Sequence, residues 1–206
     1  GGGRNHAIDL QTAGLTQMGS HGTHHGSGPM PATEAAHLLN PIRSLILSPG
    51  RLVKRLGLRP DSQVLEIGPG PGYYSVAVAK AVPRGRLTLV DIQPEMLAMA
   101  KERVQRAGLT NVEFLQGDAV SLPLTAGSVD VVFLVAVLGE VPAQADALSE
   151  IRRVLRPGGM LSLTERMTLV PHSLPSPDVI RMATAAGFEH TTSHEGPLSS
   201  TLDFRA

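Results

Sequence analysis

The sequence of 206 residues has no cysteine and no tryptophan, and its aromatic rings are limited to two tyrosines and four phenylalanines. The absence of cysteine excludes disulfide bonds, thiolate metal ligands and cysteine nucleophiles. The scarcity of aromatic rings leaves little surface on which nucleic-acid bases could stack. These absences direct attention to carboxylates, histidines and the main chain as the groups that carry chemistry.

The chain also lacks an excess of either charge and any long apolar run. It has 18 Lys and Arg residues against 18 Asp and Glu residues, so no net field attracts nucleic acid or an anionic membrane. The longest apolar run, Val131 to Leu138, is far shorter than the roughly 18 residues that cross a bilayer. We therefore expect a soluble, cytoplasmic protein with a small partner, without nucleic acid and without integral membrane association.

Glycine and histidine are concentrated at the start of the chain, where Gly1 to Gly28 holds eight glycines and four of the eight histidines. Such a composition buries too little apolar surface to offset the entropy of ordering. The letters MGSHGTHHGSG resemble a purification tag, and a solvated arm is favoured over metal binding by these histidines. We expect a flexible arm over residues 1–32, one domain over residues 33–206 and no metal site.

Hydrophobic spacing predicts alternating strands and helices in the domain. Two short helices come first, one interrupted by Pro41 and one begun by Ser48 and Pro49 and ended near Gly57. Runs rich in β-branched residues then predict strands at 64–67, 86–91, 112–116, 129–135 and 160–165. Amphipathic spacing predicts helices at 73–81, 94–107 and 143–155, the last ended by the letters RPGG. Near the C-terminus we expect a helix at 177–186 and two weaker strands at 188–193 and 198–204.

Apolar strands separated by helices are typical of a parallel sheet that is covered on both faces. We therefore predict an α/β fold, namely a doubly wound, mostly parallel, seven-stranded sheet. The last two strands are expected to form an antiparallel hairpin at one edge of this sheet.

Glycine and acidic residues follow the first predicted strand. In open α/β sheets, ligands bind beyond the carboxyl ends of the strands, where the strand order reverses. Glu66 is followed there by Gly68, Gly70 and Gly72, and glycine lets a ligand approach the main chain closely. A dinucleotide-binding fingerprint would need a further glycine where Tyr73 stands, so a pyrophosphate ligand is disfavoured.

Two further carboxylates follow the second and third predicted strands. Asp91 ends the second strand, where a carboxylate can accept both hydroxyl groups of a ribose; capping of the next helix is its alternative role. Asp118 follows the third strand in the letters GDA and could accept the exocyclic amine of a purine, with a turn as the alternative. Three successive strand ends therefore carry glycine or acidic chemistry.

Four stretches of the chain, taken in order, resemble the successive motifs of class I S-adenosylmethionine-dependent methyltransferases. They are VLEIGPGPGYYS, LVDIQPEML, LQGDAVSLPLTAGSVDVVFLVAVLGEV and IRRVLRPGGMLSLTE. The likeness covers roughly residues 35–206 and is strongest to the small-molecule group that includes the menaquinone and ubiquinone C-methyltransferases. It implies a Rossmann-like methyltransferase fold with N-terminal helices over the site.

The resemblance implies S-adenosylmethionine as the cofactor and assigns its contacts. Gly68, Gly70 and Gly72 would pass under the methionine part of the cofactor, with Glu66 supporting its amino group. The other implied contacts are Asp91 with the ribose, Ile92 beside the adenine, Asp118 and Ala119 on the far wall of the adenine pocket, and Leu134 on the methionyl side. A positively charged cofactor without phosphate agrees with the lack of Lys and Arg between Glu66 and Tyr74.

Methyl transfer is an in-line displacement that depends mainly on holding the nucleophile near and aligned, so a dedicated base is optional. The candidate catalytic residues are His37, Tyr73 and Glu140, with Tyr74 as the alternative to the adjacent Tyr73. Glu140 stands where related methyltransferases often carry histidine, although a carboxylate at a helix start also favours the helix dipole. His37 lies on the helix that is expected to fold over the site, although an isolated histidine is more often structural.

By elimination, the expected acceptor is a small organic molecule, apolar or quinone-like. The Asn/Asp-Pro-Pro-Tyr/Phe motif of nucleic-acid amine methyltransferases is missing after the fourth strand, where LVAVL stands. Two alternatives stay open. One is an NAD-dependent oxidoreductase, which shares Asp91, and the other is a non-catalytic module that retains the nucleoside pocket. Assembly as a homodimer stays open as well.

Overall fold

A computed structural model describes residues 48–166 and 173–206. The predicted arm, His37 and the helix interrupted by Pro41 lie outside the described residues. The strands are β1 (Gln63–Ile67), β2 (Arg86–Asp91), β3 (Val112–Gln116), β4 (Val129–Val135), β5 (Leu155–Arg166), β6 (Glu189–Glu195) and β7 (Ser199–Arg205). The helices are α2 (Pro49–Leu56), α3 (Ser75–Ala81), α4 (Pro94–Arg106), the 3-10 helix η2 (Leu138–Glu140), α5 (Gln144–Val154) and α6 (Ser176–Ala185). Within these two ranges, no helix has the length and apolar character needed to span a membrane.

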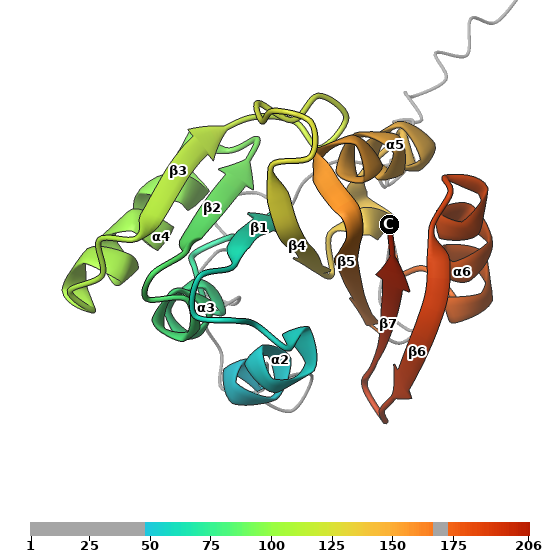
Figure 1. The fold of residues 1–206 in the computed structure, drawn as a ribbon, viewed down its shortest axis with the longest axis horizontal. Coiled ribbons are helices and arrows are strands. Elements are labelled where there is room, and N and C mark those ends of the chain that lie inside the picture. Colours follow the sequence, from blue (N-terminus) through green and yellow to red (C-terminus); the bar gives the residue numbers. More distant parts are fainter. Residues whose placement is uncertain (1–47, 167–172) are drawn as a thin grey trace, which may run out of the picture.

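The strands form one sheet in the order β3-β2-β1-β4-β5-β7-β6, with β3 and β6 at its two edges (Figure 1). β1 pairs in parallel with β2 on one side and with β4 on the other, and β3 and β5 continue the parallel pairing outwards. β7 runs antiparallel between β5 and β6, so a C-terminal hairpin forms one edge. The predicted seven-stranded, mostly parallel sheet with its C-terminal hairpin is therefore confirmed, whereas α2 does not line the cavity at the carboxyl ends of the strands. Strand order reverses at β1, where such sheets bind ligands.

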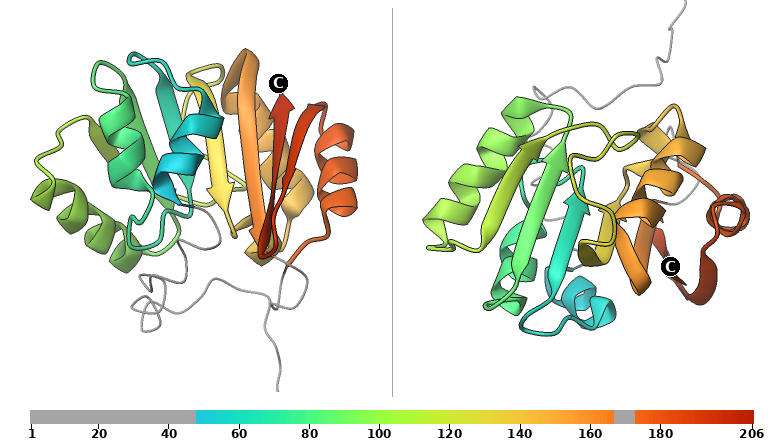
Figure 2. Two further views of the ribbon diagram at one scale, coloured as in Figure 1. Left: turned by 90° about the horizontal axis from the view of Figure 1, so that it is seen from below. Right: turned by 45° about the horizontal axis from the view of Figure 1, so that its top comes forward.

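Two apolar cores cover the two faces of the sheet. Helices α2, α3 and α4 pack on one face, and α5 and α6 pack on the other (Figure 2). Side chains of β4 alternate between the cores, because Val131 and Phe133 join the first and Val132 and Leu134 join the second. This alternation follows from the two-residue period of a strand. Burial on both faces explains why β4 reads as a nearly continuous apolar run.

Helix α2 has the boundaries that its flanking residues predict. The Ser48 hydroxyl accepts a hydrogen bond from the Arg51 N–H at 3.3 Å, and Pro49 occupies the first turn. Gly57 ends the helix with a φ of 56°, in the left-handed region that favours glycine. Leu52 and Leu56 are buried, so one face of α2 is attached to the core.

Helix α3 begins later than predicted, at Ser75 instead of residue 73. The chain first passes through Gly68, Gly70 and Gly72, which all have positive φ. A left-handed residue interrupts the regular helical repeat, so the helix starts only after this series of turns. The extra loop length brings more main chain to the carboxyl edge of the sheet.

Strand β5 is longer than predicted. α5 ends at Val154, within one residue of the predicted end, but the letters RPGG lie inside β5 instead of in a loop. Leu155 pairs with Val129 of β4, and the register shifts before Met160 pairs with Val131. A shift of this kind lets an extended strand absorb residues that cannot all pair. The two glycines therefore lie at a strand irregularity.

Gly85 and Gly50 provide a matched pair of substitutions that tests close packing at the start of β2. A Cβ atom at Gly85 would lie 2.0 Å from the Ser62 carbonyl oxygen, whereas a Cβ atom at Gly50 meets nothing within 4 Å. We expect Gly85→Ala to lower the free energy of unfolding by about 3 kcal/mol, because the backbone at Gly85 or Ser62 must move to make room for the added Cβ atom. Gly50→Ala should raise it by about 0.5 kcal/mol, because alanine favours a helix. Urea denaturation measures both values, and equal stabilities would contradict the packing at Gly85.

Candidate active site

A cavity opens at the carboxyl edge of the sheet. Its walls come from the loop after β1, the start of α4, the loop after β3 and the segment between β4 and α5. The lining residues that the sequence predicted are Glu66, Gly68, Gly70, Asp91, Ile92, Asp118, Ala119 and Glu140. Residues from the ends of β1, β2, β3 and β4 are thus brought together around one space.

The loop after β1 presents bare main chain to this cavity. Gly68 and Gly70 have φ values of 66° and 54°, a conformation that glycine adopts without a steric penalty. The Gly68 N–H donates to the Val90 carbonyl oxygen of β2 at 2.8 Å. A Cβ atom at Gly68 would lie 2.6 Å from Val137 Cγ2. Both backbone conformation and space therefore require glycine at position 68.

Gly72 serves helix packing. A Cβ atom there would lie 3.0 Å from Ala100 Cα of α4. Among the described residues, those that line the cavity do not include Gly72. The structure therefore places Gly72 against α4, where the close approach of the two segments leaves no room for a side chain.

Glu66 is a buried carboxylate at the end of β1. The residue is 3% exposed, and the Ser75 hydroxyl at the start of α3 donates to its Oε2 at 2.6 Å. A carboxylate can accept several hydrogen bonds. Glu66 is therefore an oriented acceptor that is suited to an ammonium group in the cavity.

Asp91 closes β2, and main-chain donors hold both of its oxygens. The Gln93 N–H donates to Oδ1 at 3.0 Å, and the Gly70 N–H donates to Oδ2 at 3.4 Å. Burial raises the pKa of the Asp91 carboxyl above its ordinary value, while the N–H donors of Gln93, Gly70 and Ile92 lower it. The carboxylate is thus oriented by the same loop that carries the glycines.

The wall on the side of β2 and β3 is partly exposed. Ile92 is 48% exposed, which leaves its apolar surface available to a ligand. Asp118 is also exposed, and its Oδ1 accepts a hydrogen bond from the Val120 N–H at 3.2 Å. This is the geometry of its alternative role, a turn aspartate. Ala119 beside it is buried. This wall therefore combines apolar surface with a carboxylate oriented by its own turn.

At the end of β4, Val135 lines the cavity and Leu134 does not. Leu134 is 1% exposed and belongs to the core under α5 and α6. Successive residues in a strand face opposite sides of the sheet, so the predicted residue points into the core and its neighbour faces the other way. Ala136 follows with a φ of 58°, a strained conformation that concentrates at functional sites.

Of the two adjacent tyrosines, Tyr74 lines the cavity and Tyr73 does not. Tyr73 packs at the edge of the core formed with α2, α3 and α4, and the two rings meet edge to face with centroids 4.9 Å apart. Glu140 on η2 also lines the cavity. His37 lies outside the described residues. The structure therefore brings two of the four candidate catalytic side chains to one place.

Glu165 is a buried carboxylate that the sequence analysis missed. It lies near the end of β5, is 4% exposed, and accepts backbone hydrogen bonds from Gly139 and Leu138 of η2. Burial, together with the negative charge of Glu140, raises the pKa of Glu165 to about 7. A glutamate near the end of an apolar strand is the sequence pattern that indicates it, and Glu66 in β1 shows the same pattern. Glu165 links β5 to the turn that carries Glu140.

The part of the sequence that surrounds this cavity is similar to known proteins. Residues 65–163 match a family model described as a methyltransferase domain. The chain is 38% identical over 116 residues to a demethylmenaquinone methyltransferase from Staphylococcus aureus, an alignment that covers 56% of this chain and 47% of that protein. The chain therefore spans about half the length of the curated relatives that it matches.

A solved S-adenosylmethionine-dependent methyltransferase from Aquifex aeolicus has a TM-score of 0.80 and 26% identity, over 86% of this chain and 99% of that chain. The chain therefore resembles class I S-adenosylmethionine-dependent methyltransferases, both in the sequence of residues 65–163 and in its fold. The trans-methyltransferase CalH, solved with S-adenosylhomocysteine, shares the fold, with a TM-score of 0.67 and 21% identity over 84% of this chain and 64% of that chain. The matched methyltransferase domain runs from β1 into β5 and includes the strand ends that surround the cavity.

Glu165 predicts a specific dependence of stability on pH. Its pKa is about 7 in the fold and 4.5 ordinarily, so between these values the folded state keeps a proton that the unfolded chain releases. This contribution to stability is complete below pH 4.5 and is lost as the pH rises to about 7, which amounts to about 3 kcal/mol. We expect the unfolding free energy of the unaltered chain, relative to Glu165→Gln, to fall by this amount over that range.

Urea denaturation at a series of pH values measures this difference. Glu189→Gln on the exposed edge strand β6 is the matched control and should give a curve parallel to that of the unaltered chain. Parallel curves for Glu165→Gln and the unaltered chain would contradict a shifted carboxyl group at position 165.

Proposed function

We propose that this chain is a methyltransferase that binds S-adenosylmethionine in the carboxyl-edge cavity and methylates a small organic acceptor. The observation that carries the proposal is the chemistry of the lining. Bare glycine main chain lies beside the carboxylates of Glu66, Asp91, Asp118 and Glu140, and Arg166 is the single cation among the described lining residues. A cavity of this composition favours a ligand with a positive charge and no phosphate.

The lining residues fit the parts of this cofactor. When bound, S-adenosylmethionine supplies an electrophilic methyl group on a positively charged sulfur, which departs as a neutral thioether. The main chain of Gly68 and Gly70 would contact its methionine part, and the Glu66 carboxylate would accept hydrogen bonds from its amino group. The remaining proposed contacts are Asp91 with the ribose hydroxyls and Ile92, Asp118 and Ala119 around the adenine.

The alternative of a nicotinamide dinucleotide is less well supported. A pyrophosphate prefers the N-terminus of a helix and cationic or N–H donors. The loop instead carries Tyr73 where the fingerprint requires glycine, and Glu66 and Asp91 would repel a phosphate placed beside the glycines. We therefore favour the sulfonium cofactor.

The proposed acceptor is small, apolar and quinone-like. Val135, Val137 and Val141 provide an apolar wall on the side of β4, and apolar walls with few polar groups are typical of small-molecule sites. One relative is named a demethylmenaquinone methyltransferase. Demethylmenaquinone is therefore the first acceptor to test.

In-line transfer requires the acceptor to be held near the methyl group and aligned with it, so orientation supplies most of the acceleration. Glu140 lies among the valines of the apolar wall, and we assign it the task of accepting a hydrogen bond or proton from the acceptor. Tyr74, from the glycine loop, would orient the acceptor from the other side. His37 stays a candidate from the sequence alone.

Replacement of Asp91 tests the cofactor site. We expect Asp91→Ala to weaken S-adenosylhomocysteine binding about 100-fold, because two hydrogen bonds to a charged acceptor are lost. Isothermal titration calorimetry measures the affinity, and Asp91→Asn checks that the loss does not arise from unfolding. Asp146→Ala is the matched control, because Asp146 is an exposed carboxylate on α5, and it should leave the affinity unchanged.

Two results would count against the proposed cofactor. Unaltered affinity of Asp91→Ala for S-adenosylhomocysteine would remove Asp91 from the site. Tight binding of NADH without binding of S-adenosylhomocysteine would favour the oxidoreductase.

Replacement of Glu140 tests the acceptor side. We expect Glu140→Gln to lower kcat for methyl transfer about 100-fold, because a group that accepts a proton or orients the acceptor is lost, while S-adenosylhomocysteine affinity stays unchanged. Transfer of a radiolabelled methyl group to demethylmenaquinone, and to a metabolite extract, provides the readout. A normal kcat in Glu140→Gln would exclude this role. Failure of the unaltered chain to label any acceptor, despite tight cofactor binding, would favour a non-catalytic module.

A further inference from the structure

A second hollow lies at the opposite edge of the sheet from the cofactor cavity. It has a volume of about 960 Å³ and lies between α2, the starts of β1, β4 and β5, the end of β7 and the middle of β6. β7 ends at this edge because it runs antiparallel to β5. We call this hollow the amino-edge cleft. The length of the strands separates it from the carboxyl-edge cavity.

Cationic side chains line the amino-edge cleft out of proportion to the rest of the chain. Six Lys and Arg residues and two carboxylates line it in the described structure, although the whole chain has 18 of each kind. The cations are Arg51, Lys54, Arg55, Arg59, Arg156 and Arg205. The first three share one side of α2, because they are spaced three and four residues apart. The neutral net charge of the chain therefore conceals a local excess of positive charge.

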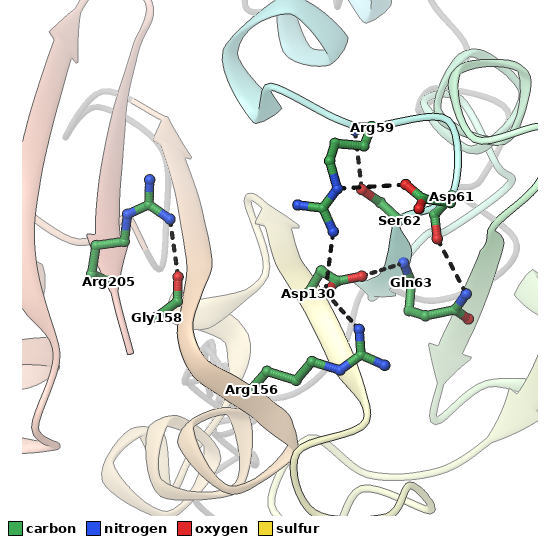
Figure 3. Close-up of polar contacts among 8 residues, drawn as sticks. All are labelled: Arg59, Asp61, Ser62, Gln63, Asp130, Arg156, Gly158 and Arg205. Carbon is green, nitrogen blue, oxygen red and sulfur yellow. Dashed lines mark hydrogen bonds and ion pairs between the residues drawn. The ribbon is translucent and has the colours of Figure 1, made fainter.

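Asp130, one of the two carboxylates, is already engaged inside the cleft. Its Oδ1 lies 2.6 Å from Arg156 Nη1 and 3.7 Å from Arg59 Nη2. Its Oδ2 accepts the Gln63 N–H at 2.8 Å. Figure 3 shows Arg59 and Arg156 directed at Asp130 from two sides. Asp130 thus neutralises only this pair of cations.

Asp203, the second carboxylate, is engaged as well. It accepts the Ser162 hydroxyl at 2.7 Å on Oδ1, and its Oδ2 lies 3.5 Å from His194 Nε2. Asp203 is 4% exposed, so it contributes little surface to the cleft. Neither carboxylate therefore balances the cations on α2 and at the end of β7 by direct contact.

Four cations of the cleft form no ion pair within residues 48–166 and 173–206, namely Arg51, Lys54, Arg55 and Arg205. Arg55 Nη1 donates to Thr201 Oγ1 at 2.8 Å, and Arg205 Nη1 donates to a carbonyl oxygen at 3.0 Å. One bond orients each guanidinium group and leaves its other N–H donors. Burial and the positive charge of Arg51 lower the pKa of Arg55, and the negative charge of Asp203 offsets a smaller part of this shift. An anion among these groups would relieve their mutual repulsion.

Arginine presents a planar fork that matches a phosphate group at two points, so a cluster dominated by arginine is suited to phosphate. The described lining residues include no Phe, Tyr or Trp, and the small imidazole of His194 is their one ring, which leaves little surface for base stacking. The volume of the cleft is that of a small-ligand pocket. We infer that the amino-edge cleft binds a compact ligand with two or more phosphate groups, either free or as a lipid headgroup. The cleft and the carboxyl-edge cavity are then separate sites for ligands of opposite charge.

Isothermal titration of the full chain with sodium tripolyphosphate in low-salt buffer tests this inference. We expect saturable binding that weakens about tenfold in Arg51→Gln/Lys54→Gln, because two charged contacts are lost. Both side chains are exposed and have no side-chain partner among the described residues, so the variant is expected to fold. Binding should also weaken at physiological salt.

The matched control is Lys101→Gln/Arg103→Gln on α4, which removes the same two charges outside the cleft and should change the affinity less than about twofold. Binding of S-adenosylhomocysteine at the opposite edge checks that each variant folds. If the unaltered chain fails to bind that compound, the proposed function fails, while the tripolyphosphate titration stays interpretable.

Three outcomes would overturn the inference. They are the absence of saturable binding at millimolar tripolyphosphate, equal losses in the two double variants, and tight binding of a single-stranded oligonucleotide that tripolyphosphate cannot displace. Vesicles that contain cardiolipin, whose headgroup carries two phosphate groups, and that bind the chain and release it on addition of tripolyphosphate would support the inference and identify a lipid headgroup as the source of the phosphate.

Discussion

The functional geometry depends on the position of β1 between two parallel neighbours. Because β1 pairs with β2 and β4 in the same direction, three carboxyl ends meet at one edge, while α3 and α5 leave toward opposite faces. The space between the diverging connections becomes the cavity. The Gly68 N–H then bonds to Val90, and Gly70 contacts Asp91. Backbone pairing therefore sets the distance between the glycine loop and the carboxylate proposed to hold the ribose.

Buried carboxylates at this edge carry a free-energy cost of desolvation, and hydrogen bonds from neutral protein groups offset only part of that cost. Burying a charge is costly unless it is hydrogen-bonded or paired, and Glu66, Asp91 and Glu165 are each less than a tenth exposed. The Ser75 hydroxyl bonds to Glu66, backbone N–H groups bond to Asp91 and Glu165, and the charge of Arg166 offsets part of the cost of burial at Glu165. Burial raises the pKa of both Asp91 and Glu165 for this reason. A cationic ligand lowers the cost of keeping such groups ionised, which supports the proposed sulfonium cofactor.

Local sequence patterns predicted the sheet and most of the cavity, because apolar runs mark strands and glycine or acid marks their ends. The predicted and observed limits of β2, β3 and β4 coincide. The predicted residues that do not line the cavity depend on information that local patterns do not contain. Leu134 and Val135 differ only in which face of the sheet they meet, and Gly72 depends on the approach of α4. The amino-edge cleft was missed because its cations come from α2, β5 and β7, which only the tertiary fold brings together.

The carboxyl edge and the amino edge of the sheet carry opposite charge, because the direction of each strand determines which of its ends lies at which edge. Acidic residues at or next to the last residue of β1, β2 and β5 gather at the carboxyl edge. The arginines before β1, at the start of β5 and at the end of the antiparallel β7 gather at the amino edge. A neutral sum of 18 positive and 18 negative residues is therefore compatible with two local fields. A net charge of zero excludes a uniform attraction to anions, but it does not exclude a concave site where only part of the positive charge is balanced.

The C-terminal hairpin contributes to the charge of the cleft as well as to the sheet. Because β7 runs antiparallel to β5, its last residues, including Arg205, lie at the amino edge.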